Sequence, residues 1–358
     1  MSSIEQEFLL PHIARMTGYI PGEQPKGQKF VKLNTNENPY PPSSLVLERL
    51  KAACDGDLRL YPDAAASEVC RRLAEQFAVP AQQILVGNGS DELLNTAMRC
   101  FVGTGDRVVF PTPTYPYYAK LVELQNATAV TVDFDESFAL PGDALTTAAG
   151  KLTLVANPNS PSGTLASTDE LAALAAAVPG LLLIDEAYVD FSDGGCIELV
   201  ETYPNLIVVR TMSKSFSLAG MRIGFCFASP EVTAAMRKVK EHYNIGSLSQ
   251  VAAAAALDDV QTMHANARRV CQTRSRLSEA LGELGFHVWP SAGNFVLARV
   301  PDGRAAQLYA MLRDRGVLVR YFEVPRLRDC LRISVGTEEE IDILLRELDR
   351  CIGRGRAR

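Results

Sequence analysis

Short apolar segments recur along the middle of the chain, and stretches with helical spacing separate most of them. The strand candidates are residues 84–86, 107–110, 129–132, 152–155, 181–184, 206–209 and 223–228. Strands that are apolar throughout and alternate with helices are typical of a mainly parallel sheet covered on both faces. Ligands of such sheets bind beyond the carboxyl ends of the strands. The pattern therefore predicts an α/β fold whose binding site lies at that edge.

The segment before this middle part has a different character. The first 45 residues are rich in proline, so we expect an extended arm over residues 1–29 and a short strand at residues 30–33. Helix candidates follow at residues 45–54 and 67–77, where apolar residues recur every three or four positions.

A helical region over residues 230–284 has one break, near residues 244–247, which we interpret as a domain boundary. Beyond it, strand candidates alternate with helix candidates at residues 294–297, 305–315, 317–320, 330–335 and 338–351. The sequence thus predicts a large domain over residues 30–245 and a smaller α+β domain over residues 246–358. The arm over residues 1–29 is expected to pack against the small domain.

Composition argues against several classes of protein. A net charge of −6 and a pI near 5.4 argue against a nucleic-acid-binding or anionic-membrane surface. The eight cysteines are scattered without a Cys-x-x-Cys pair, and with four histidines in the chain we predict no metal site. Scattered cysteines fit a reducing compartment. Because we find neither a signal peptide nor a long apolar run, we expect a cytoplasmic protein without a membrane segment.

Residues 211–224 join two of the strand candidates and place a lysine, Lys214, between them. Burying an unpaired ammonium group is strongly unfavourable. The cost disappears if the amine forms a Schiff base with an aldehyde cofactor, which also gives it a chemical role. The string Ser-Lys-x-Phe-x-Leu-x-Gly-Met-Arg-x-Gly resembles the cofactor-lysine signature of fold type I pyridoxal-phosphate (PLP) aminotransferases. The resemblance implies that fold and a Schiff base between PLP and Lys214.

Residues 87–92 follow a strand candidate and open a helix. Glycines there allow close approach of the backbone, and the free amides of the first helical turn attract phosphate, although the same residues also fit an ordinary capped helix. By resemblance, the residues that contact the cofactor phosphate are Gly89, Ser90, Asp91, Ser213 and Arg222. Tyr61 matches a family tyrosine that reaches the phosphate of the neighbouring subunit's cofactor, which implies a homodimer.

Asp185 directly follows the apolar strand candidate at residues 181–184, where a lone carboxylate would lie at low dielectric. Facing the pyridine nitrogen, it would keep that nitrogen protonated, so that the ring withdraws electrons from the reacting carbon. The resemblance places Tyr115 flat against the ring and Tyr188 near the ring oxygen. The predicted catalytic residues are therefore Lys214, Asp185 and Tyr188.

Residues 157–163 resemble the family's Asn-Pro-x-Asn-Pro-Thr-Gly turn, whose second asparagine donates to the ring oxygen of the cofactor. This chain has Ser160 at that place. The hydroxyl group of Ser160 can donate instead, or the amide of Asn157 or of Asn159 can take over the contact. The sequence leaves these alternatives open.

Arg332 lies in an apolar strand candidate, and Arg320 ends another. An arginine in such a strand is expected to grip an anion. By resemblance, Arg332 takes the carboxylate of the glutamate donor, and Tyr19, Arg320 and Arg332 surround a substrate phosphate. The predicted substrate-binding residues are these three and Asn36.

Within this superfamily the chain resembles the histidinol-phosphate aminotransferases most, through residues 19–22, 33–39, 59–62 and 330–334. The resemblance implies transfer of the amino group of L-histidinol phosphate to 2-oxoglutarate, giving imidazole-acetol phosphate and L-glutamate in histidine biosynthesis. Two rivals use a similar core, an aromatic-amino-acid aminotransferase and a threonine-phosphate decarboxylase. A regulator without catalysis is a third, which the presence of Lys214 and Asp185 disfavours.

Overall fold

The computed structural model describes residues 8–18, 22–24 and 30–353. These residues form a seven-stranded sheet in the order β2-β8-β7-β6-β5-β3-β4. Its strands are β2 (Ile84–Gly87), β3 (Arg107–Thr112), β4 (Thr128–Asp133), β5 (Leu152–Ala156), β6 (Leu181–Asp185), β7 (Leu206–Thr211) and β8 (Gly224–Ala228). Neighbouring strands run parallel, except that β8 is antiparallel to both β2 and β7. The prediction of a mainly parallel sheet is confirmed.

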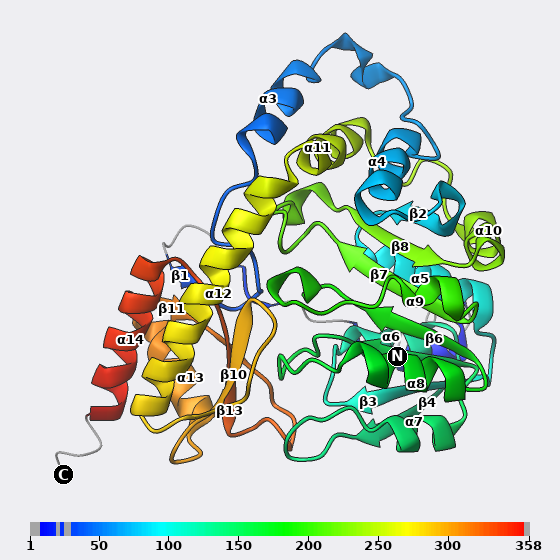
Figure 1. Ribbon diagram of the computed structural model, residues 1–358. Coiled ribbons are helices and arrows are strands. Elements are labelled where there is room, and N and C mark those ends of the chain that lie inside the picture. Colours follow the sequence, from blue (N-terminus) through cyan, green and yellow to red (C-terminus); the bar gives the residue numbers. More distant parts are fainter. Residues whose placement is uncertain (1–7, 19–21, 25–29, 354–358) are drawn as a thin grey trace.

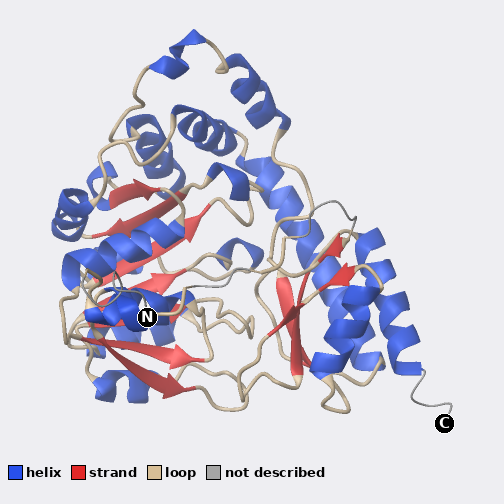
Figure 2. Cartoon of the chain, turned by 180° about the vertical axis from the view of Figure 1, so that it is seen from behind, coloured by secondary structure: helices blue, strands red, loops and turns tan. Residues whose placement is uncertain are grey.

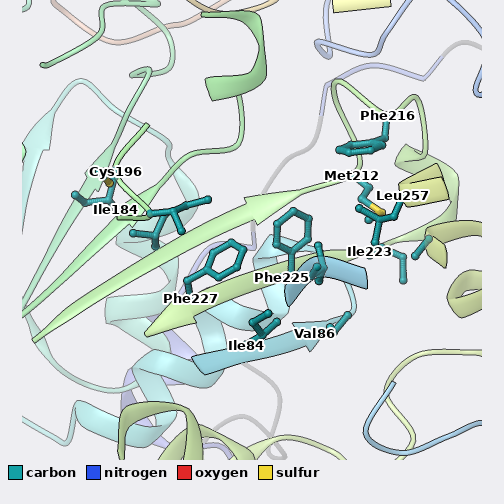
Figure 3. Close-up of a cluster of buried hydrophobic side chains, with 14 of the residues drawn as sticks. Ile84, Val86, Ile184, Cys196, Met212, Phe216, Ile223, Phe225, Phe227 and Leu257 are labelled. Carbon is teal, nitrogen blue, oxygen red and sulfur yellow. The ribbon is translucent and has the colours of Figure 1, made fainter. Parts of the chain in front are cut away.

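Both faces of this sheet are buried, as its continuous apolar strands predicted. Alternate residues of a strand point to opposite faces, and on β8 Phe225 and Phe227 join one hydrophobic cluster while Cys226 joins the other. Figure 3 shows the first cluster, with the two phenyl rings packed beside Ile84 and Val86 of β2. The side chains of each face are thereby removed from water by a layer of helices.

Helices cover the large sheet on both sides, as Figure 2 shows. They are α4 (Ser67–Phe77), α5 (Ser90–Phe101), α6 (Tyr117–Leu124), α7 (Gly142–Ala148), α8 (Thr168–Ala177), α9 (Leu199–Thr202), α10 (Pro230–Val239) and α11 (Ser247–Asp258). Further out, α3 (Ser44–Ala52) packs on α11, and α2 (Pro11–Arg15) contacts α6. None of the helices in the described ranges combines the length and apolar composition that a bilayer crossing needs.

A smaller lobe follows, built on a four-stranded sheet in the order β12-β13-β10-β9. Its strands are β9 (His287–Val288), β10 (Phe295–Arg299), β12 (Arg320–Tyr321) and β13 (Cys330–Ser334), all antiparallel to their neighbours. Three helices lie beside it in Figure 1: α12 (Val260–Glu283), α13 (Ala305–Asp314) and α14 (Glu338–Gly353). β1 (Val31–Lys32) joins this lobe by pairing with β11 (Val317–Leu318).

Two sequence interpretations were wrong in detail. The helical region up to residue 284 has a second break at Asp259, because its side chain caps α12 by accepting a hydrogen bond from the Thr262 backbone amide. The strand expected at residues 317–320 is two short strands, since β11 pairs with β1 whereas β12 pairs with β13.

The division into domains at residue 245 stays a prediction, and several contacts bear on its limits. Helix α11 packs on α3 and α4, whereas β1 lies with the small lobe. In the described part of the arm, Glu23 forms an ion pair with Arg313 of α13.

Candidate active site

One cavity between the two lobes collects most of the predicted site residues. Asp185 at the end of β6 and Thr211 at the end of β7 both line it, so the cavity lies at the carboxyl edge of the parallel strands. The predicted residues that line it are Asn36, Ser90, Asp91, Tyr115, Ser160, Asp185, Tyr188, Ser213, Lys214, Arg222, Arg320 and Arg332. Gly89, Asn157 and Tyr61 do not line it, and Tyr19 lies outside the described residues.

Lys214 is presented by a loop whose neighbouring side chains are buried. Met212 and Phe216, on either side of it, pack into the hydrophobic cluster of Figure 3. The side-chain amide of Asn38 donates to the backbone oxygens of Lys214 and Ser215, at 3.0 and 3.1 Å. With its backbone fixed in this way, the lysine reaches into the cavity, where Nζ donates to the Thr35 backbone oxygen at 3.3 Å.

A chain of buried charges supports this loop from behind. Arg210 donates from Nε to Oε2 of the fully buried Glu186 at 2.8 Å and forms an ion pair with Asp190 at 3.4 Å. Asp190 in turn accepts a hydrogen bond from the hydroxyl group of Ser215, the neighbour of Lys214. Sequence reasoning missed Arg210, although an arginine directly after the apolar residues 206–209 was a usable signal.

Asp185 is buried at the floor of the cavity. Its carboxylate accepts hydrogen bonds from the hydroxyl group of Tyr118 at 3.1 Å and from the Ala187 backbone amide at 3.2 Å. Burial raises the pKa of Asp185 to about 7, because the charged form loses its hydration, and these hydrogen bonds only partly oppose that effect. Tyr118 was not predicted, since nothing in its local sequence distinguishes it from a core aromatic residue.

The N-terminus of α5 and the loop before β8 form one end of the cavity, where the cofactor phosphate was predicted to bind. The Arg222 guanidinium lies 3.3 Å from Asp91 Oδ2 and 3.4 Å from Ser213 Oγ. Gly89 has a φ of +81° and a ψ of 165°, a backbone conformation that essentially only glycine adopts, so this position needs glycine. Tyr115 donates from its hydroxyl group to Asp91 Oδ1 at 3.1 Å.

The side chains of both asparagines in the turn over residues 157–163 form hydrogen bonds with nearby protein groups. Asn157 bonds to the backbone of Ala166, and Asn159 bonds to Thr114 and Ser162. Of the three candidates for the ring-oxygen contact, Ser160 is the one that lines the cavity. Its Oγ accepts a hydrogen bond from Arg332 Nη1 at 3.1 Å.

The small lobe contributes the opposite wall of the cavity. Arg332 also donates from Nη2 to the Asn34 backbone oxygen at 2.9 Å, and Arg320 lies beside it on β12. Asn36 donates from Nδ2 to the Tyr188 hydroxyl group at 3.1 Å and is itself held by Ser334. The segment after the arm thus orients Tyr188 from across the cavity.

Tyr61 does not line the cavity. Its side chain is 80% exposed and stacks on Tyr243, with ring centres 4.4 Å apart. In the described ranges no group of histidine, cysteine, aspartate and glutamate side chains is arranged to hold a metal ion.

Residues 28–348 match the family model for aminotransferase class I and II. The chain belongs to this aminotransferase family. The aminotransferase is 44% identical over 349 residues to histidinol-phosphate aminotransferase of Citrifermentans bemidjiense, covering 97% of this chain and 99% of that one. It is 42% identical over 343 residues to histidinol-phosphate aminotransferase 1 of Trichormus variabilis, covering 95% and 98%.

A solved structure agrees with these relatives. The aminotransferase superposes with a TM-score of 0.91 on histidinol-phosphate aminotransferase from Sinorhizobium meliloti in complex with pyridoxal-5'-phosphate, at 28% identity, covering 98% of this chain and 99% of that one. The predicted fold type I architecture is thereby confirmed.

Proposed function

We propose that this aminotransferase uses PLP to transfer the amino group of L-histidinol phosphate to 2-oxoglutarate, giving imidazole-acetol phosphate and L-glutamate in histidine biosynthesis. The observation that supports this best is the pair Arg320 and Arg332, which face Lys214 and Asp185 across one cavity. Paired guanidinium groups suit a site that must accept a phosphate and a carboxylate in turn. The names of the relatives point to the same substrate.

The residues present fit PLP. Lys214 would hold its aldehyde through a covalent bond, and Arg222, Ser213 and the N-terminus of α5 would bind its phosphate. Asp185 would face the pyridine nitrogen, and a cationic nitrogen there would lower the raised pKa of this carboxyl. Of the remaining contacts, Tyr115 would cover the ring face, and Ser160 or Tyr188 would reach the ring oxygen.

Bound PLP supplies an electron sink for the substrate carbon that loses its proton. Lys214 would move a proton at that carbon, as a positioned general base and acid. The carboxylate of Asp185 would keep the proton on the pyridine nitrogen. Asn36 orients the hydroxyl group of Tyr188 beside Lys214, whose Nζ lies 5.5 Å from the centre of the Tyr188 ring.

We also propose a homodimer in the cytoplasm. The exposed ring of Tyr61 is outside its own chain's cavity and would contact the cofactor phosphate of the neighbouring subunit. Exposed apolar side chains close to it in sequence, Leu58 and Leu60, would be covered by the same association. Sedimentation velocity tests the dimer, and a monomer at micromolar concentration would contradict it.

Steady-state assays of the purified, PLP-loaded enzyme test the reaction. L-histidinol phosphate, L-phenylalanine and threonine phosphate are compared, each with 2-oxoglutarate. We expect the highest kcat/KM with histidinol phosphate. A preference for phenylalanine of about tenfold, or about 1.4 kcal/mol, would overturn the proposed substrate, and release of carbon dioxide from threonine phosphate would overturn the reaction type.

A further inference from the structure

Two guanidinium groups share one aromatic ring at the small-lobe end of the cavity. The Cζ atoms of Arg320 and Arg332 lie 5.3 and 5.5 Å from the centre of the Phe322 ring. All three side chains line the cavity. Arg332 also lies 5.4 Å from the ring of the fully buried Phe295.

The register of the sheet makes this arrangement costly. Arg320 of β12 and Arg332 of β13 are directly opposite each other in the antiparallel pair. Like charges at opposite positions destabilise a sheet. The carboxylates that line the cavity are Asp91 and Asp185, which bond to Arg222 and Tyr118 at its other end. A bound anion between the arginines would offset their repulsion, and the electron-rich face of Phe322 offsets part of it without a ligand.

The ring also decides which parts of the guanidinium groups stay accessible. A ring packed on the flat face of an arginine leaves the N–H groups at its edges free to donate. A phosphate dianion has oxygens enough to accept from two arginines at once, whereas a carboxylate is satisfied by one. The distance and angle between the two guanidinium groups therefore matter more for phosphate than for carboxylate.

We propose that Phe322 is a positioning residue that sets the geometry of Arg320 and Arg332 and so makes the site selective for a phosphate-bearing substrate. The inference rests on the proposed function, since it names the residue that tunes that same pocket. Phe322 is well placed for this role because its ring also packs against a hydrophobic cluster of the small lobe and the loop after β4. That cluster consists of Phe134, Phe138, Trp289, Leu297, Leu327 and Cys330.

The test replaces Phe322 by leucine, which keeps apolar volume but removes the ring, and by tyrosine, which keeps the ring. Phe138→Leu is the matched control, because Phe138 belongs to the same cluster and has the Arg326 guanidinium 5.1 Å from its ring, yet does not line this cavity. For each PLP-loaded variant we measure KM and kcat with histidinol phosphate and with L-glutamate. We also measure inhibition of the L-glutamate half-reaction by inorganic phosphate.

Without the ring, both guanidinium groups lose their fixed position and must be ordered when phosphate binds, a cost that corresponds to about tenfold in an equilibrium constant. Phe322→Leu should therefore raise KM for histidinol phosphate and the inhibition constant of phosphate about tenfold. KM for glutamate and both kcat values should change less than about threefold. Phe322→Tyr should restore wild-type values, and Phe138→Leu should lower the melting temperature without this selective change.

Equal changes in the two KM values, an unchanged inhibition constant for phosphate, or the same selective loss in Phe138→Leu would each overturn the inference. The proposed function fails separately, if the wild-type enzyme does not use histidinol phosphate. In that case inhibition by inorganic phosphate, measured with whichever amino donor the wild type accepts, still tests Phe322.

Discussion

The two ends of the active-site cavity differ in how their charges are satisfied. At the large-lobe end, Arg222 bonds to Asp91 and Ser213, and Asp185 accepts a hydrogen bond from Tyr118. At the small-lobe end, Arg320 has no hydrogen-bond or ion-pair partner in the described part of the chain, and a phenyl ring is its neighbour. The first end is built in advance by the protein. At the second end Arg332 is held by Ser160 and Asn34, and a bound anion would give Arg320 a partner, which fits the proposed enzyme with two alternating substrates.

The largest expected effect is that of replacing Lys214, which lies at the end of the cavity that is built in advance. Lys214→Ala should abolish turnover, by at least about 10⁴-fold, because under the proposed function the same amine would hold the cofactor and move the proton. The visible absorbance of the PLP-loaded enzyme should disappear with it. Lys238→Ala, an exposed lysine of α10, is the control and should keep both. Turnover near wild type in Lys214→Ala would refute the assignment.

Asp185→Asn tests the role of the Asp185 carboxyl group, at the same end of the cavity. The variant should still bind PLP but lose about 10²–10⁴-fold in kcat, since an amide does not hold a proton on the ring nitrogen.

The raised pKa of Asp185 also predicts how the stability of the cofactor-free protein depends on pH. The pKa of Asp185 is about 7 in the folded protein and near 3.8 when exposed. The folded state thus binds the extra proton, and this group makes the free energy of unfolding fall as pH rises between those values. Denaturation from pH 4 to 7 should show that fall in the wild type relative to Asp185→Asn.

The sequence predicted which residues line the two ends better than it predicted the contacts among them, for a physical reason. Apolar strands with polar residues at their carboxyl ends predict which residues meet at one edge of a sheet, and Lys214 and Asp185 do lie there. Contacts between distant segments leave no local pattern. Neither the bond from Asn36 to Tyr188 nor the position of Phe322 between two arginines follows from spacing along the chain.

The turn over residues 157–163 shows the same limit at a single site. Three polar side chains were candidates there, and local sequence does not choose among them. In the fold, the side chains of Asn157 and Asn159 form hydrogen bonds with nearby protein groups, whereas Ser160 lines the cavity.

Removing the support behind the lysine loop should cost stability rather than specificity. Arg210→Met leaves the fully buried Glu186 without its ion-pair partner, so the free energy of unfolding should fall by about 3–5 kcal/mol. Arg71→Met is the matched control, because Arg71 forms exposed ion pairs with Glu68 and Glu75 on α4, and such pairs contribute about 0–1 kcal/mol. Urea denaturation measures both. Equal losses in the two variants would mean that the buried chain of charges is not the support we describe.

The smallest effect belongs to the open end, where one arginine remains when the other is removed. Arg320→Ala should raise KM for histidinol phosphate about 10- to 100-fold, the equivalent of about 1.5–3 kcal/mol for a charge-assisted hydrogen bond. KM for glutamate should rise less, because Arg332 would still bind a carboxylate under the proposed function. Arg304→Ala, which removes an arginine paired with Asp302 on the surface of the same lobe, should change neither value. An equal rise in KM for both substrates would mean that Arg320 binds anions in general. It would also contradict the distinction between phosphate and carboxylate that we draw for this end of the cavity.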